Sequence, residues 1–155
     1  MNHNFLKFLA EKEEMEPKKA MEKTVFCDAV NGDIVMRDPV LKHLVAAVDK
    51  IDELIPIEQA YVIGPILKKI YSEDAPIQVV VLIDKNDIDE VLHDRLLQIV
   101  VDLNKTVVAD TRHPTEIKIQ LVNGSAGVKK WTERQEALFD ISKNKFVKRP
   151  IEERS

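Results

Sequence analysis

The sequence predicts a small α/β (α+β) protein in which a small mixed sheet carries helices on one side. Residues 77–83 are apolar almost throughout, which is typical of a strand buried on both faces. Residues 115–122 alternate between polar and apolar, as a half-buried strand does. Apolar residues recur at helical spacing in 40–54 and 88–104, which predicts two amphipathic helices. The chain has 155 residues, of which 45% are hydrophobic and 32% charged, and this suits one globular domain.

The chain is expected to have two parts. Residues 1–23 are predicted to form an N-terminal helix and a charged linker, and residues 24–155 to form the single domain. Apolar side chains near the start share one helical face, and Pro17 interrupts the segment that follows.

Three features favour a cytoplasmic protein. Even the longest uninterrupted apolar runs, such as residues 79–83, cannot cross a bilayer, so no membrane partner is expected. The start lacks the basic and apolar regions of a signal peptide. Cys27 is the only cysteine and cannot form an internal disulfide.

The segment 24–37 allows two interpretations. Asn31-Gly32 between two β-rich runs is a strong hairpin signal. Alternatively, Met21, Val25 and Ala29 recur at helical spacing, and Asn31-Gly32 would then end a helix. The hairpin is slightly favoured.

The helix over residues 38–54 has clear boundaries. Asp38 is expected as its N-cap and Pro39 as its first residue, and Pro56 ends it. The next four elements are expected to be a strand, a turn, a helix and a loop, at residues 60–63, 64–65, 66–71 and 72–76.

The remaining elements follow the buried strand. Asp87 is expected to cap the helix over 88–104. Its inward residues should be Val91, Leu92, Leu96, Ile99, Val100 and Leu103. Residues 123–127 are expected to form a loop, and a C-terminal hairpin should pair residues 137–141 with 146–148. His113, which follows Arg112 in an apparent loop, is expected at the surface.

The segments 62–65 and 74–81 carry a resemblance to a known family. A strand ends in Gly64-Pro65, and the next strand opens with Pro76-Ile77-Gln78. This spacing resembles the signature of the nucleotidyltransferase superfamily, the DNA polymerase β-like fold, over residues 58–122. That signature has Gly-Ser at the turn, Asp-x-Asp at the start of the next strand and a third carboxylate on a later strand. An unrelated α/β domain, in which Gly64-Pro65 is only a turn, is the alternative.

The resemblance implies that the family's catalytic groups are missing. The signature serine falls on Pro65, the two aspartates on Pro76 and Gln78, and the third carboxylate on Gln120, or on Lys118 with a shift of two. Members of the family are two-metal enzymes whose carboxylates hold Mg²⁺. Proline offers no ligand, and glutamine is a weak neutral one. The resemblance therefore implies a pseudo-nucleotidyltransferase without catalytic residues, metal or cofactor, acting as a binding or assembly protein with a protein partner. Its vestigial nucleotide-binding cleft would comprise Gly64, Pro65, Pro76, Gln78 and Gln120.

Two alternatives remain open. Glu73 and Asp74, just before the strand, would serve as relocated ligands for Mg²⁺ in an active nucleotidyltransferase. A single-stranded nucleic-acid contact would use the basic and aromatic residues near the C-terminus, Lys129, Lys130, Trp131, Lys145, Lys148 and Arg149. Residues 129–155 carry eight basic and five acidic groups, whereas residues 24–128 carry ten and seventeen, so a nucleic-acid contact would be confined to the tail.

The N-terminal segment offers one further resemblance. Leu9-Ala10-Glu11 is similar to the Leu-x-Glu tripeptide after which the targeting helix of internal head proteins of large tailed phages is clipped. This would imply a phage origin and processing of the segment.

Overall fold

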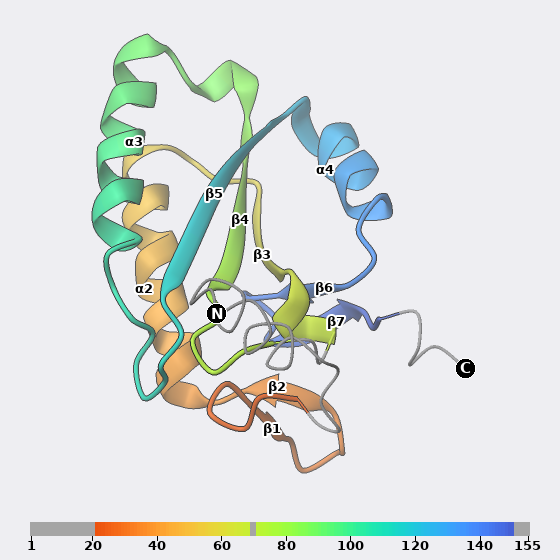
Figure 1. The fold of residues 1–155 in the computed structure, drawn as a ribbon. Coiled ribbons are helices and arrows are strands. Elements are labelled where there is room, and N and C mark those ends of the chain that lie inside the picture. The colour runs from red at the N-terminus through yellow and green to blue at the C-terminus, as the bar shows by residue number, and fades with distance from the viewer. Residues whose placement is uncertain (1–20, 69–70, 151–155) are drawn as a thin grey trace, which may run out of the picture.

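The computed structural model describes residues 21–68 and 71–150 and contains a five-stranded and a two-stranded sheet (Figure 1). The larger sheet has the strand order β5-β4-β3-β6-β7. Its strands are β3 (Gln59–Ile63), β4 (Ile77–Asp84), β5 (Thr115–Val122), β6 (Leu138–Asp140) and β7 (Lys145–Lys148). Only β4 and β5 are parallel, and the other pairs are antiparallel. The predicted α+β class with a small mixed sheet is confirmed, and so is the C-terminal hairpin.

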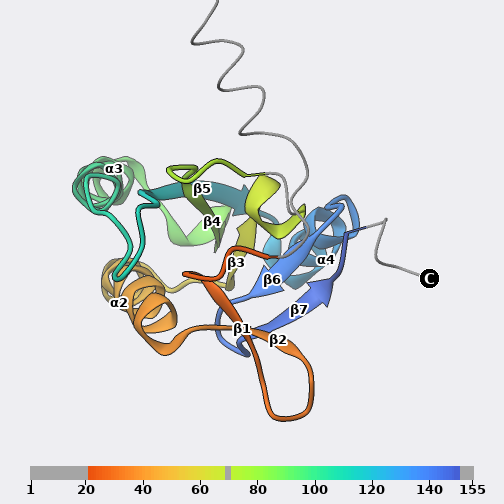
Figure 2. The same ribbon diagram turned by 60° about the horizontal axis from the view of Figure 1, so that its bottom comes forward.

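Helices lie on both faces of the larger sheet. The helices α2 (Asp38–Leu54) and α3 (Glu90–Leu103) cover one face, and α4 (Gly124–Glu133) lies against the other (Figures 1 and 2). The prediction of helices on one side was wrong, because the glycine-rich segment 123–127 was expected to form a loop. Gly127 instead allows close packing, since a Cβ there would lie 3.1 Å from that of Val122.

The hairpin interpretation of residues 24–37 is confirmed. The strand β1 (Phe26–Asp28) pairs antiparallel with β2 (Ile34–Met36). Gly32 has φ +88°, a left-handed conformation that suits glycine in a tight turn. Met21 and Val25 are buried just before the hairpin. The predicted N-terminal helix and the Leu9-Ala10-Glu11 tripeptide lie outside the described residues.

Several predicted helix boundaries need correction. Arg37, not Asp38, is the N-cap of α2, and Asp38 is its first residue. Asp89, not Asp87, caps α3 by accepting a hydrogen bond of 2.8 Å from the Leu92 amide, because Ile88 is still extended. Val91 is 63% exposed rather than inward, since it lies in the first turn of α3.

The predicted helix over residues 66–71 is replaced by a shorter element. The segment Pro65–Lys68 forms the 3-10 helix η1, in which the Leu67 amide donates to the Gly64 carbonyl at 3.1 Å. Residues 69 and 70 lie outside the described chain. No helix among the described residues is long and apolar enough to cross a membrane.

The core lies on both sides of the larger sheet. The main cluster packs β3, β4 and β5 against α2 and α3, and includes the ring contact between Phe26 and Phe139 at 5.7 Å. A smaller cluster under α4 contains Tyr61 and Leu82, against which Trp131 packs. The α4 side is therefore apolar only where the helix covers it.

The outer edge of β5 is partly closed by a side chain. The side-chain amide of Asn104 makes two hydrogen bonds to the backbone of Ile117. Its Nδ2 donates to the Ile117 carbonyl at 3.3 Å, and its Oδ1 accepts from the Ile117 backbone N–H at 2.7 Å. A second contact joins the Thr115 amide to the Thr106 carbonyl at 2.9 Å. Asn104 therefore occupies the position that a neighbouring strand's peptide group would take.

Candidate functional site

The candidate site is a polar region of the sheet on the side that carries α4. Strand alternation places Gln78 of β4 and Glu116, Lys118 and Gln120 of β5 on this side, because their neighbours Val80 and Val122 belong to the cluster under α4. We call these four residues the polar sheet face. Gln78 and Glu116 are partly buried, while Lys118 and Gln120 are exposed.

The turn after β3 lies directly against Gln78. Gly64 has φ +95°, and a Cβ at this position would lie 2.9 Å from both Cδ and Oε1 of Gln78. Gln78 is also opposite Ile63 in the β3–β4 register. The structure thus brings together the turn glycine and the second position of the signature-like strand, as the sequence spacing requires.

The strand register determines which β5 residue lies beside Gln78. Glu116 is directly opposite Gln78, whereas Gln120 is opposite Leu82, further along the strand. Glu116 forms an ion pair with Lys118 at 3.4 Å. The structure therefore places Glu116, and not Gln120, next to Gln78. The alternation along residues 115–122 shows which side chains share a face, but not how β5 is aligned with β4. Sequence reasoning therefore missed this carboxylate.

A small pocket adjoins the turn. It measures about 290 Å³, and its lining includes Gly64, Lys68, Arg134 and Glu136. The Lys68 ammonium is paired with the Glu136 carboxylate. Arg134 makes no ion pair with another residue of the described chain. The pocket offers hydrogen-bond donors and one uncompensated cation to a polar ligand.

The arrangement does not suit a pair of magnesium ions. Mg²⁺ requires near-octahedral oxygen ligands and favours carboxylates. The polar sheet face supplies one carboxylate, which is already paired with a lysine. Over residues 21–68 and 71–150, no group of three or more His, Cys, Asp or Glu side chains could hold a metal.

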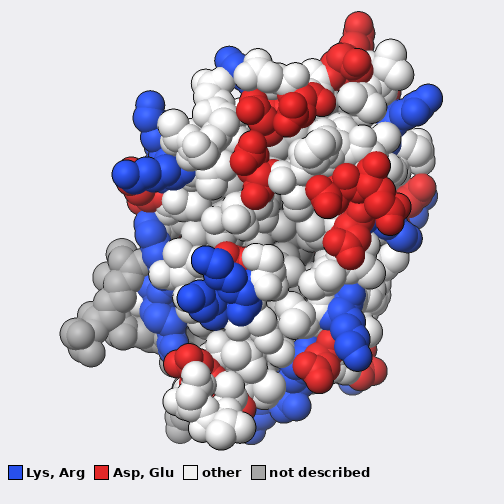
Figure 3. All heavy atoms as spheres, turned by 180° about the vertical axis from the view of Figure 1, so that it is seen from behind, with Lys and Arg blue, Asp and Glu red and all other residues white. Residues whose placement is uncertain are grey.

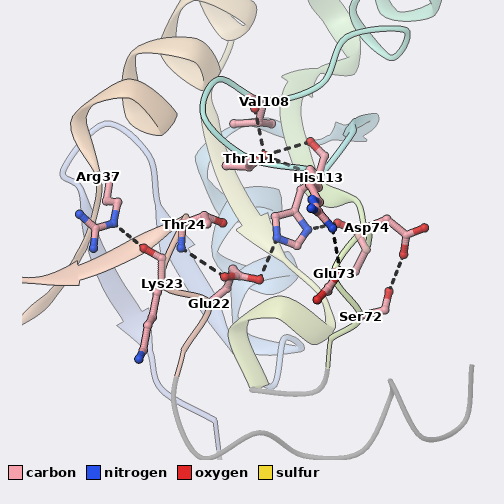
Figure 4. Close-up of polar contacts among 12 residues, drawn as sticks. Glu22, Lys23, Thr24, Arg37, Ser72, Glu73, Asp74, Val108, Thr111 and His113 are labelled. Carbon is pink, nitrogen blue, oxygen red and sulfur yellow. Dashed lines mark hydrogen bonds and ion pairs between the residues drawn. The ribbon is translucent and has the colours of Figure 1, made fainter.

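Glu73 and Asp74 are engaged in separate contacts, Glu73 with the loop before β5 and Asp74 within its own loop (Figure 4). The Arg112 guanidinium donates to Glu73 Oε2 at 3.0 Å, and the Ser72 hydroxyl donates to Asp74 Oδ1 at 3.0 Å. The two side chains of the Glu73–Arg112 pair are about four-fifths exposed. Solvent-exposed pairs of this kind are weak. Neither carboxylate joins Glu116 in a metal-binding group.

Of the basic and aromatic residues near the C-terminus, Trp131, Lys148 and Arg149 make contacts within the fold. Trp131 stacks on Tyr61 with ring centroids 5.9 Å apart. The Lys148 ammonium donates to three carbonyl groups at the end of α4, those of Thr132, Glu133 and Gln135, at 2.8, 3.1 and 3.3 Å. A cation at a helix C-terminus is favourable because it satisfies free carbonyls and opposes the helix dipole. The Arg149 guanidinium lies 4.9 Å from the centre of the Phe146 ring. Lys129, Lys130 and Lys145 are exposed.

His113 is a buried anchor rather than a surface residue. It is 1% exposed, and its ring joins two other segments (Figure 4). Nδ1 lies 2.6 Å from the Ala75 carbonyl oxygen, and Nε2 lies 3.1 Å from Glu22 Oε2. The expectation of a surface position was wrong, because Arg112 pairs with Glu73 while His113 turns inward. Burial and the charge of Glu22 also raise the pKa of Tyr71.

A second histidine lies among threonines. His43 Nε2 is 3.3 Å from Thr106 Oγ1 and 3.4 Å from Thr115 Oγ1. Burial lowers the pKa of His43, because a charged imidazole would lose hydration there. This contact ties α2 to the start of β5 and presents no reactive arrangement.

Known proteins give no further guide to this site. No protein-family model, curated protein or solved structure matches the chain.

Proposed function

We propose that the chain is a non-catalytic binding or assembly protein on a nucleotidyltransferase-like scaffold. Two features support the scaffold: β3 and β4 are antiparallel around the Gly64 turn, and β5 is parallel to β4. The observation that carries the proposal is the set of residues found at the signature positions and on the strand beside them. Pro76 and Gln78 occupy the positions where the resemblance requires carboxylates, beside a glutamate paired with Lys118.

The chemistry of these residues favours binding over phosphoryl or nucleotidyl transfer. Two-metal catalysis needs anionic oxygens that hold both ions about 4 Å apart. Glutamine amides instead donate and accept hydrogen bonds without charge. Together with Arg134 in the adjoining pocket, they suit a polar ligand bound without metal, such as a segment of a protein partner. We expect a cytoplasmic location, since the chain has a single cysteine.

Thermal unfolding tests the proposal. The chain is melted with a panel of nucleoside triphosphates, with and without Mg²⁺ or Mn²⁺. A ligand that binds only the folded state at 100 times its dissociation constant adds about 2.7 kcal/mol to the free energy of unfolding. We expect no shift that needs both metal and nucleotide.

A shift that requires both would overturn the proposal. The Glu73→Gln and Asp74→Asn variants would then show whether the loop carboxylates hold the ion, and Glu116→Gln would test the sheet in the same way. Loss of the shift in the loop variants alone would establish the relocated Mg²⁺ site.

The nucleic-acid alternative now depends on fewer residues, because Trp131 and Lys148 are engaged in the fold. It would use the exposed side chains of Lys129, Lys130 and Lys145. Binding to a single-stranded oligonucleotide should then weaken steeply as salt rises. A triple substitution of these lysines by glutamine should abolish that binding if the alternative holds.

A further inference from the structure

We propose that a groove beside α2 is a docking site for a protein segment that carries an apolar anchor flanked by Lys or Arg. The groove lies between α2, the start of β3 and the end of β6, and measures about 300 Å³. We call it the α2 groove. It is on the α2 side of the sheet, opposite the polar sheet face, so this proposal does not depend on the nucleotidyltransferase resemblance.

The lining of the α2 groove is mostly apolar. The apolar residues are Val45, Val48, Ile57, Ala60 and Ile141. Val48, Ala60 and Ile141 belong to the main core, while Val45 is 36% exposed at the mouth. An aliphatic or aromatic side chain entering this groove would therefore contact the core directly and remove apolar surface from water.

The rim of the groove is acidic and uncompensated. Asp49 and Glu58 line it, and neither makes an ion pair or a side-chain hydrogen bond with another residue of the described chain. Lys50 and Lys143 are close in sequence to the rim residues Asp49 and Ser142, yet they pair with neither carboxylate. Figure 3 shows the molecule from behind the view of Figure 1, and acidic side chains gather over the upper half of this face with uncharged surface between them.

This charge works against the stability of α2. Asp49 and Glu53 are four residues apart on the same helix, where like charges repel. Asp52 and Glu53 are near the C-terminal end of α2, where the helix dipole favours cations. The last turn of α2 contains no basic residue. Asp52 has a structural role, because its Oδ1 accepts a hydrogen bond of 3.1 Å from the Ile57 amide. The side chains of Asp49, Glu53 and Glu58 make no such hydrogen bond with the rest of the described chain.

The apolar lining and the acidic rim together favour a partner segment that combines an apolar anchor with flanking cations. The anchor fills the groove, and the flanking Lys or Arg side chains neutralise Asp49 and Glu58. Nucleic acid and anionic lipid would be repelled by this rim. Recognition of this kind depends on a buried central anchor, while the rim charges provide selectivity.

The test uses three capped hexapeptides and the full chain labelled with ¹⁵N. The probe is acetyl-Lys-Lys-Leu-Phe-Lys-Lys-amide. One control replaces its lysines by glutamate, and the other replaces Leu-Phe by Ser-Ser. We expect only the probe to bind, with amide shifts concentrated at Val48, Ile57, Ala60 and Ile141.

Charge-reversal variants locate the contact. Glu58→Lys and Asp49→Lys should each lower the affinity for the probe by about three- to tenfold, because each replaces an attraction by a repulsion of similar size. Asp94→Lys is the matched control, since Asp94 is an exposed acid on α3. It should leave the affinity unchanged. Each variant is first shown to melt like the parent.

Four outcomes would overturn the proposal. They are no binding of the probe, equal binding of the Ser-Ser peptide, amide shifts confined to another surface, and equal weakening by Asp94→Lys. Equal binding of the Ser-Ser peptide would show attraction by charge alone.

Discussion

Replacing Gly64 by alanine tests the geometry of the candidate site most directly. The added Cβ has two consequences in the structure. It forces an L residue to adopt φ +95°, and it lies 2.9 Å from Cδ and Oε1 of Gln78. Gly32 provides a matched control, because it has φ +88° but no atom within 4 Å of an added Cβ.

The two costs can be estimated separately. A left-handed backbone conformation costs a non-glycine residue about 1–2 kcal/mol. Displacing the end of the Gln78 side chain from its preferred rotamer adds about 0.5–1.5 kcal/mol. Gly64→Ala should therefore lower the free energy of unfolding by about 1.5–3.5 kcal/mol, and Gly32→Ala by about 1–2 kcal/mol. Reduced entropy of the unfolded chain affects both variants alike, so it cancels in the comparison.

Urea unfolding of the two alanine variants measures these costs, and thermal unfolding should agree, at about 2–4 °C per kcal/mol for a chain of this size. In a Gln78→Ala background, the extra cost at Gly64 should disappear and leave only the backbone cost. If Gly64→Ala is no more destabilising than Gly32→Ala, the turn does not lie against Gln78. If removing the Gln78 side chain recovers nothing, the excess arises elsewhere.

Three further predictions concern residues around the site. Lys148→Met should lower the free energy of unfolding by about 1–3 kcal/mol, because it leaves the carbonyls at the end of α4 without their donor. Lys145→Met, at an exposed position, should change it very little. Urea unfolding of the two variants measures the difference. Because burial lowers the pKa of His43 below its ordinary 6.5, the unfolded chain binds more protons near that pH, so stability should fall as pH falls through it. This part of the pH dependence should be missing from His43→Gln, and an unchanged profile would contradict it. A double-mutant cycle of Glu22→Ala and His113→Ala should give a coupling energy of about 1–3 kcal/mol, and additivity would refute the buried contact.

The sequence predicted the regular elements well where periodicity was strong. The buried run at 77–83 and the helical stripe at 40–54 both formed as expected. The helix at Gly124–Glu133 was missed because Gly124 and Gly127 are typical of loops. Gly124 is explained by its φ of +60°, and Gly127 by its close contact with Val122. Such a contact depends on tertiary packing, which local sequence does not encode.

The candidate site was predicted in part. The resemblance grouped Gly64 and Gln78 in one cleft, and in the structure these two residues lie against each other. The neighbour on β5 depended on a register between strands that are far apart in sequence, and Glu116 was therefore missed. His113 was assigned to the surface for a similar reason, since its partner Glu22 is 91 residues away.

The contact between Asn104 and Ile117 has a consequence for how the molecule behaves in concentrated solution. Unpaired strand edges recruit strands from other molecules and start aggregation. Here the edge is already bonded at Ile117 by a tethered amide, and at Thr115 by the Thr106 carbonyl. A strand from another molecule would have to displace these groups or begin beyond Ile117, where β5 has only five residues before its end. Asn104 thus limits growth of the sheet at the one edge formed by a parallel strand.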